Sequence, residues 1–77
     1  MKKYYYVGIM SVDKKDDNIS FVYKLDYDTK TAYWKKYSDF NNNEKPFLFS
    51  SKRDAENIAF WLFGVCAMVI TTNYELR

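Results

Sequence analysis

The chain has 77 residues, a formal net charge of +2 from twelve Lys or Arg against ten Asp or Glu, no histidine, and a single cysteine, Cys66. These totals exclude a disulfide within the chain, nucleophilic dyads and triads that use histidine, and histidine-based zinc sites. A net charge this small also gives no general attraction to nucleic acid. We expect a single domain, residues 1–77, with one small core.

The first expected element is a strand from Tyr4 to Val12, because aromatic and β-branched residues dominate this stretch. Alternate residues of a strand point to opposite faces, and here both faces are apolar, which favours a central position in a sheet. Gly8 indicates a bulge or a close approach to the backbone, for which the helix described below is the expected neighbour. The charged stretch 13–18 predicts a solvated turn, because its acids lack the spacing of a calcium-binding loop.

Two more strands are expected after this turn, from Ile19 to Asp26 and from Thr31 to Tyr37, with a tight turn between them. In the second strand the alternation predicts one apolar face of Ile19, Phe21, Tyr23 and Leu25. In the third strand one face would carry Ala32, Trp34 and Lys36 and the other Tyr33, Lys35 and Tyr37. Lysines near the end of the third strand are typical of a sheet edge.

A helix is expected to begin at Ser51, whose hydroxyl can accept a hydrogen bond from the backbone N–H of Asp54. Before it, 38–46 predicts a surface loop with Phe40 at its tip, and 46–49 predicts a short extended segment. The spacing of apolar residues predicts that one helix face packs on the sheet, formed by Ala55, Ile58, Ala59 and Leu62. Phe60 would point about 140° away from Ala55, on the other side of the helix.

The apolar run from Ile58 to Ile70 can be divided at Gly64, a residue that commonly ends helices. We expect a last strand from Val65 to Ile70 that continues to Tyr74 and is central in the sheet, because both of its faces are apolar. The alternative is one long helix from Ser51 to Ile70. The predicted fold is an α+β domain with an antiparallel sheet of about four strands, in the order β-β-β-α-β, and one helix packed on one face.

The sequence predicts neither catalysis nor a bound cofactor or metal. Histidine is absent and neither glycine lies in a phosphate-binding loop. The lone Cys66 is expected to be a small buried hydrophobe in a reducing compartment, the cytoplasm. The apolar run from Ile58 to Ile70 is shorter than the roughly 20 residues that span a bilayer, so no membrane association is expected.

Sixteen aromatic residues are more than one small core requires, which suggests that some serve binding. Phe60 is either covered by 40–49 or exposed as an interface anchor, where a protein partner or a second copy of the chain would bury it. The second candidate surface lies on the third strand: Tyr33, Trp34, Lys35, Lys36 and Tyr37. Rings interleaved with lysines suit a protein interface or, alternatively, single-stranded nucleic acid.

The chain is short and rich in Lys, Asn and Tyr, with a strand-rich start and a helix that opens with Ser51-Lys52-Arg53-Asp54-Ala55. In these features the whole chain resembles the small accessory proteins of phages and prophages of Gram-positive bacteria. The resemblance implies a non-catalytic protein that binds a bacterial host protein and blocks or redirects it. Inhibition of an antiviral-defence protein, such as a CRISPR nuclease, is one such role.

Overall fold

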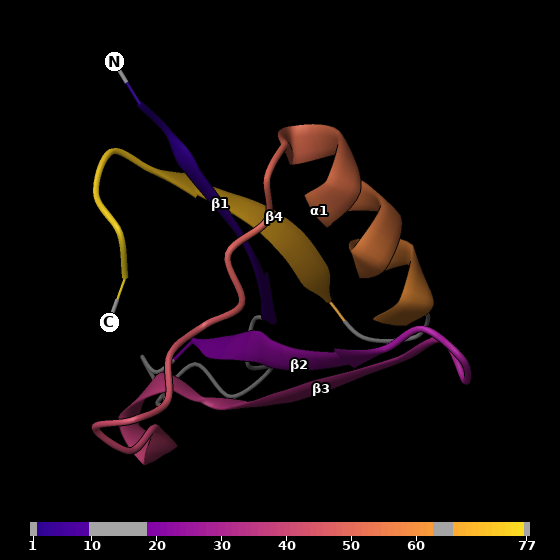
Figure 1. The fold of residues 1–77 in the computed structure, drawn as a ribbon, viewed down its shortest axis with the longest axis horizontal. Coiled ribbons are helices and arrows are strands. Elements are labelled where there is room, and N and C mark those ends of the chain that lie inside the picture. The colour runs from indigo at the N-terminus through magenta and orange to yellow at the C-terminus, as the bar shows by residue number, and fades with distance from the viewer. Residues whose placement is uncertain (1, 10–18, 63–65, 77) are drawn as a thin grey trace.

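The structure, a computed structural model, describes residues 2–9, 19–62 and 66–76. Its strands form one antiparallel sheet in the order β3-β2-β1-β4, and Figure 1 shows α1 beside β1 and β4. The elements are β1 (Tyr4–Ile9), β2 (Ser20–Asp26), β3 (Thr31–Lys36), the 3₁₀ turn η1 (Tyr37–Asp39), α1 (Lys52–Ala59), the 3₁₀ turn η2 (Phe60–Leu62) and β4 (Ala67–Thr72). The α+β fold, the order of its elements and the central position of β1 are confirmed. The predicted turn at 13–18 and the predicted helix end at Gly64 lie outside the described residues.

The last strand is at an edge of the sheet, so the prediction of a central strand is wrong. β4 pairs with β1 at six positions, from Tyr4 opposite Thr72 to Ile9 opposite Ala67, and it ends the strand order. Apolar residues on both faces of a strand indicate what covers those faces and carry no information on whether both edges are paired. The alternative of one long helix is excluded, because α1 ends at Ala59 and η2 at Leu62.

The core lies between α1 and the sheet, and the predicted inner face of the helix is confirmed. The buried apolar residues of this core are Val7, Ile9, Val22, Ala32, Phe49, Ala55, Ile58 and Leu62. At the start of α1, the Ser51 hydroxyl accepts the backbone N–H of Asp54 at 3.2 Å, as predicted. The Asp54 carboxylate in turn accepts the hydroxyl of Ser50 at 2.8 Å.

The extended segment 46–49 closes a gap between the two central strands. Among the described residues, β1 and β2 pair at two positions, Gly8 with Phe21 and Ile9 with Ser20. Beyond them, the backbone N–H of Phe47 donates to the Val22 carbonyl at 2.8 Å, and that of Phe49 donates to the Tyr5 carbonyl at 3.0 Å. These bonds satisfy backbone groups that the diverging strands leave open, and they place Phe47 and Phe49 against the core.

An irregularity in β2, between Val22 and Lys24, changes which residues share a face. The sequence predicted Phe21 and Leu25 on one face, but Leu25 packs against the helix-side core whereas the Phe21 ring contacts Tyr6 on the opposite face. Such a bulge shifts the alternation of side chains by one residue. The simple two-residue period therefore fails at this point of the strand.

The face of the sheet opposite α1, here called the outer face, holds a second group of packed rings. Edge-on contacts of 5.3–6.3 Å between centroids join Tyr6 to Phe21, Phe21 to Tyr37, Tyr37 to Phe40, and Phe40 to Tyr23. Phe40, expected at the tip of a surface loop, instead lies over this face. Part of the aromatic surplus thus stabilises the fold, because such pairs contribute beyond their buried area.

Gly8 also lies beside the outer face and not beside the helix as expected. A Cβ built at this position would lie 2.3 Å from Cδ1 of Ile70 and 3.3 Å from Cγ2 of Ile19. The close neighbours are thus two side chains from the adjacent part of the sheet.

Candidate binding surface

The structure divides the predicted surface on β3 between the two faces of the sheet. Trp34 lies opposite Val22, a residue of the helix-side core, whereas Tyr33 lies opposite Lys24 and Tyr37 packs on the outer face. Tyr33 is 40% exposed and Trp34 42% exposed. The predicted alternation along β3 is confirmed, so these residues do not form one continuous surface.

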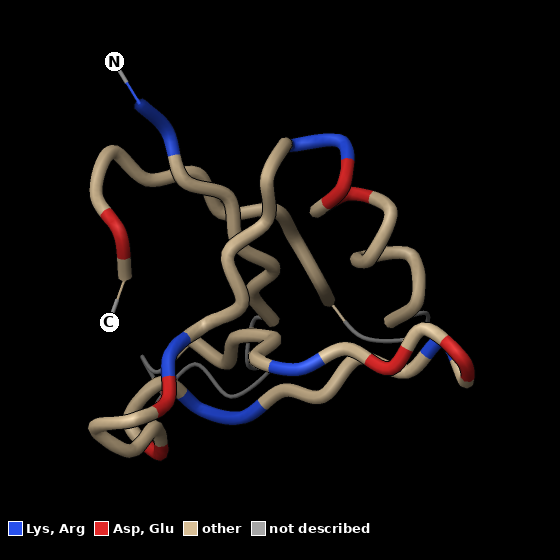
Figure 2. Tube along the Cα trace, in the orientation of Figure 1, with Lys and Arg blue, Asp and Glu red and all other residues tan. Residues whose placement is uncertain are grey.

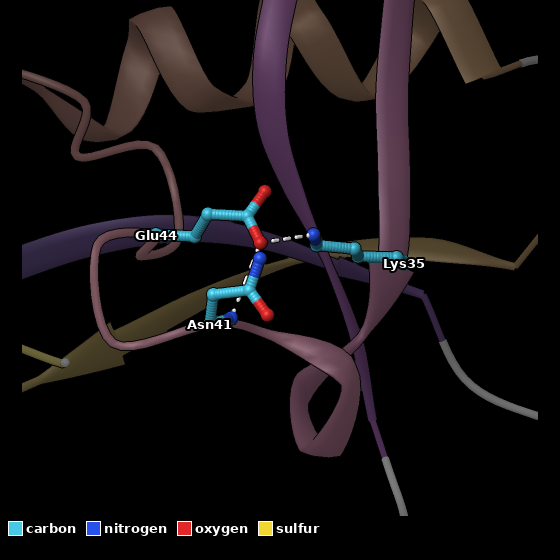
Figure 3. A network of polar contacts seen from close by, with 3 residues as sticks. All are labelled: Lys35, Asn41 and Glu44. Carbon is cyan, nitrogen blue, oxygen red and sulfur yellow. Dashed lines mark hydrogen bonds and ion pairs between the residues drawn. The ribbon is translucent and has the colours of Figure 1, made fainter.

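Lys35 is engaged within the chain. Its Nζ donates to Oε1 of Glu44 at 2.5 Å, and the same oxygen accepts the backbone N–H of Asn41 at 3.1 Å (Figure 3). The Lys35 side chain, followed by the Asn41 N–H, lowers the pKa of Glu44 below its usual value. The ammonium also lies 4.9 Å from the ring centroid of Tyr23 and 5.3 Å from that of Phe40. Lys35 therefore holds the 40–44 loop against the outer face.

Tyr37 and Tyr33 differ in how much of the ring is available. Tyr37 is half-buried, with ring centroids of Phe21 and Phe40 at 5.3 and 5.7 Å. Tyr33 is exposed, and the Nζ of Lys24 lies 5.5 Å from its ring centroid. Lys36, at the end of β3, is exposed. The rings of β3 that a partner can reach are thus those of Tyr33 and Trp34.

Phe60 is exposed, so the alternative in which residues 40–49 cover it is wrong. It is 80% exposed at the first position of η2, directly after α1. Phe47 and Phe49, which were candidates to cover it, contact each other at 4.8 Å and pack against the core. Phe60 lies off the buried face of the helix, as the helical spacing predicted, but on the side next to β4.

Phe60 lies beside the edge strand β4. Glu56, Ala59 and Phe60 line a shallow hollow of about 400 Å³ together with Ala67, Met68 and Val69 of β4. Ala67 and Val69 pack against the helix-side core, so Met68 between them projects to the outer face, where it is 45% exposed. Exposed apolar side chains therefore flank β4 on both faces. We call these six residues the α1–β4 surface.

Met68 was missed from the sequence because its exposure depends on the edge position of β4. A signal was nevertheless present: residues 66–74 contain no charged side chain. Within the described part of the chain, no strand pairs with the far side of β4. Cys66, expected to be buried, is exposed just before this strand, since β4 begins one residue later.

The described residues contain no group of three or more Cys, Asp or Glu side chains placed to bind a metal ion. Within the same residues, no helix has the length and apolar character needed to cross a membrane. Comparison with protein families, curated proteins and solved structures finds no match for this chain.

Proposed function

We propose that the chain is a non-catalytic protein-binding module that acts through the α1–β4 surface. The observation that carries the proposal is the 80% exposure of Phe60 beside the side of β4 that no described strand pairs with. An edge strand offers a row of backbone donors and acceptors to an incoming strand. The partner would therefore add a strand to β4 and cover Phe60.

The side chains around β4 suit such a partner. Phe60 on the helix side and Met68 on the outer face would contact alternate residues of an added strand, because its side chains also alternate between faces. Fully burying an exposed Phe or Met side chain contributes roughly 1.5–3 kcal/mol before the cost of ordering. Aromatic residues are also prominent among the anchors of protein interfaces.

The absence of histidine from the sequence supports a role without catalysis. Among the described residues, the two clear pKa shifts have structural causes: burial raises the pKa of Tyr6, and the Lys35 side chain lowers that of Glu44. The resemblance to phage accessory proteins adds a biological role to the proposal, the binding and blocking of a bacterial host protein. Only that resemblance supports this role.

The test is a binding assay with the immobilised chain, exposed both to a lysate of Gram-positive bacteria and to a differently tagged copy of the chain. We expect stoichiometric retention of one protein by the wild type and its loss in Phe60→Glu. Tyr33→Glu, which changes an exposed ring at the opposite edge of the sheet, is the matched control and should retain the partner. A wild-type chain that retains neither a second copy nor another protein would refute the proposal.

Single-stranded nucleic acid is the second candidate, favoured by the exposed Tyr33 with the Lys24 ammonium 5.5 Å from its ring centroid. Against it, Trp34 lies on the other face and Lys35 is bound to Glu44. Anisotropy of labelled single-stranded and duplex oligonucleotides at two salt concentrations distinguishes the cases. Salt-dependent binding that Tyr33→Ala weakens would support this candidate, and no binding at micromolar protein would exclude it.

A further inference from the structure

We infer that the strand accepted by β4 is β4 of a second copy, so that two chains form one continuous eight-stranded antiparallel sheet about a two-fold axis. The number follows from two sheets of four strands. This inference rests on the proposed function, because it names the occupant of the α1–β4 surface. Its basis is the charge, the pairing geometry and the position of Phe60 along β4.

Charge is the first argument. Residues 66–74 are uncharged, and Figure 2 shows neither blue nor red along β4. Edge strands that do not pair with another chain are usually protected by Lys, a proline or a bulge. β4 has none of these, since its pairing with β1 is regular over all six positions. Two copies of this strand can therefore lie side by side without opposing like charges.

Pairing geometry is the second argument. A two-fold axis perpendicular to the sheet makes the two β4 strands antiparallel, which is the pairing already used between β4 and β1. With the axis at Val69, each Val69 lies opposite its counterpart, Met68 lies opposite Ile70, and Ala67 opposite Thr71. The exposed Met68 is then covered by the apolar Ile70 of the other copy.

The position of Phe60 is the third argument and places the axis in the first half of β4; we take Val69, which also pairs Met68 with Ile70. The hollow beside Phe60 is lined by Ala67, Met68 and Val69, the first half of β4. The axis leaves both helices on the same face of the joined sheet, so pairing at Val69 brings both Phe60 rings to one face of the strand pair, with the exposed Glu56 side chains at the helix side of the two hollows. The α1–β4 surface of one chain thus contacts the same surface of the other chain, as a two-fold interface requires.

The expected dimer is weak. One six-residue strand, one Phe and one Met from each copy bury less than the roughly 1,200–2,000 Å² of a standard interface. Sedimentation velocity from about 10 μM to about 1 mM should therefore show a reversible monomer–dimer equilibrium. Concentration-dependent protection from hydrogen exchange should be concentrated in the backbone amides of β4.

Two variants test the interface. Met68→Lys and Phe60→Glu should each raise the dimer dissociation constant at least about tenfold, whereas Leu48→Glu, at an exposed apolar side chain outside the α1–β4 surface, should change it by less than about twofold. Circular dichroism and thermal unfolding verify that each variant is folded. A wild type that stays monomeric throughout the concentration range, or a Met68→Lys variant that dimerises like wild type, would overturn the inference.

Cross-linking tests the register. With Val69 on the axis, Cys66 lies opposite Thr72 of the other copy, so the thiols of a Thr72→Cys variant should form disulfides between chains on mild oxidation. Within one chain the two positions are about 20 Å apart along the strand, too far for a disulfide. Thr71→Cys is the control, because residue 71 points to the other face and should cross-link poorly. Equal cross-linking of the two variants would refute the register.

The outcomes also separate this inference from the proposed function. A monomeric wild type that retains another protein from a lysate, with loss of that protein in Phe60→Glu, would refute the second copy as occupant and leave the binding module intact. Absence of both self-association and retained protein would refute both.

Discussion

The two edge strands of the sheet differ in charge and in how their side chains are used. β3 ends in Lys35 and Lys36, and Lys35 is held by Glu44 and by the rings of Tyr23 and Phe40. β4 carries no charged residue, pairs regularly with β1, and is flanked by the exposed side chains of Phe60 and Met68. Both strands are six residues long, so length does not explain the difference.

The comparison shows that one small domain can have one sheet edge that carries lysines and another that is uncharged, and we propose that the uncharged edge accepts a partner. Lysines at an edge disfavour pairing with another chain, because pairing would bring charges together or remove them from water. β3 has this protection and β4 lacks it. The predictions below test how each edge is held, in order of decreasing effect on stability.

The largest expected effect is at Tyr6, which holds the end of the chain beyond β4. Tyr6 is 1% exposed and its ring packs edge-on against Phe21, while its hydroxyl oxygen accepts the backbone N–H of Leu76 at 2.8 Å. Tyr6→Ala should lower the free energy of unfolding by about 3–5 kcal/mol, because it leaves a cavity on the outer face. Urea denaturation monitored by circular dichroism measures this loss.

Two further variants divide this effect into its parts. Tyr6→Phe keeps the ring and removes one hydrogen bond, so a loss of about 0.5–1.5 kcal/mol is expected. Tyr74→Phe, at an exposed ring after the end of β4, is the control and should change the free energy of unfolding by less than about 0.5 kcal/mol. If Tyr6→Ala were as mild as Tyr6→Phe, the outer face would not be a second core.

The elements of the fold follow from the sequence because they depend on local patterns. The N-cap at Ser51, the inner helix face at Ala55 and Ile58, and the outward position of Phe60 all result from the helical period and short-range hydrogen bonds. These features need no knowledge of the rest of the chain. The predicted helix was accordingly confirmed, together with the position of Phe60 off its buried face.

The errors arise where distant segments decide the outcome. The edge position of β4 depends on which strands β1 selects as neighbours, and the irregularity after Val22 coincides with the hydrogen bond from Phe47. The packing of Phe40 and the exposure of Met68 follow from those choices. The alternation of side chains within a strand predicts which of its faces are apolar, but it does not predict which strands pair along its edges.

The next effect in size is expected at Lys35, which holds the 40–44 loop against the β3 side of the sheet. Lys35→Met keeps the apolar stem and removes the charge that lies over Tyr23 and Phe40. We expect a loss of about 0.5–1 kcal/mol, the usual contribution of cation–π contacts at accessible sites. Lys45→Met, which removes a looser ion pair with Glu75 at 3.6 Å, is the control and should change stability less. Equal effects at the two lysines would contradict the role of Lys35.

The same contact predicts a pH dependence below pH 4.5. Lys35 lowers the pKa of Glu44 from the usual 4.5, so the folded state binds fewer protons at this group than the unfolded state. Its contribution is therefore complete above pH 4.5 and is lost as the pH falls through the lower pKa of the folded state. The difference in unfolding free energy between wild type and Glu44→Gln should shrink in that range. A difference that is unchanged or grows on acidification would exclude this linkage.

The smallest change in stability is expected at Phe60, although its effect on binding should be large. At 80% exposure the ring contributes little to the core of the monomer, so Phe60→Ser should alter the free energy of unfolding by less than about 0.5 kcal/mol when measured at low protein concentration. At high concentration the wild type alone should gain stability, because dimerisation favours the folded state by mass action. A thermal midpoint that rises with concentration in the wild type and stays constant in Phe60→Ser would place the contribution of this ring in association rather than in folding. Equal concentration dependence in both proteins would show that the open edge of the sheet does not use Phe60.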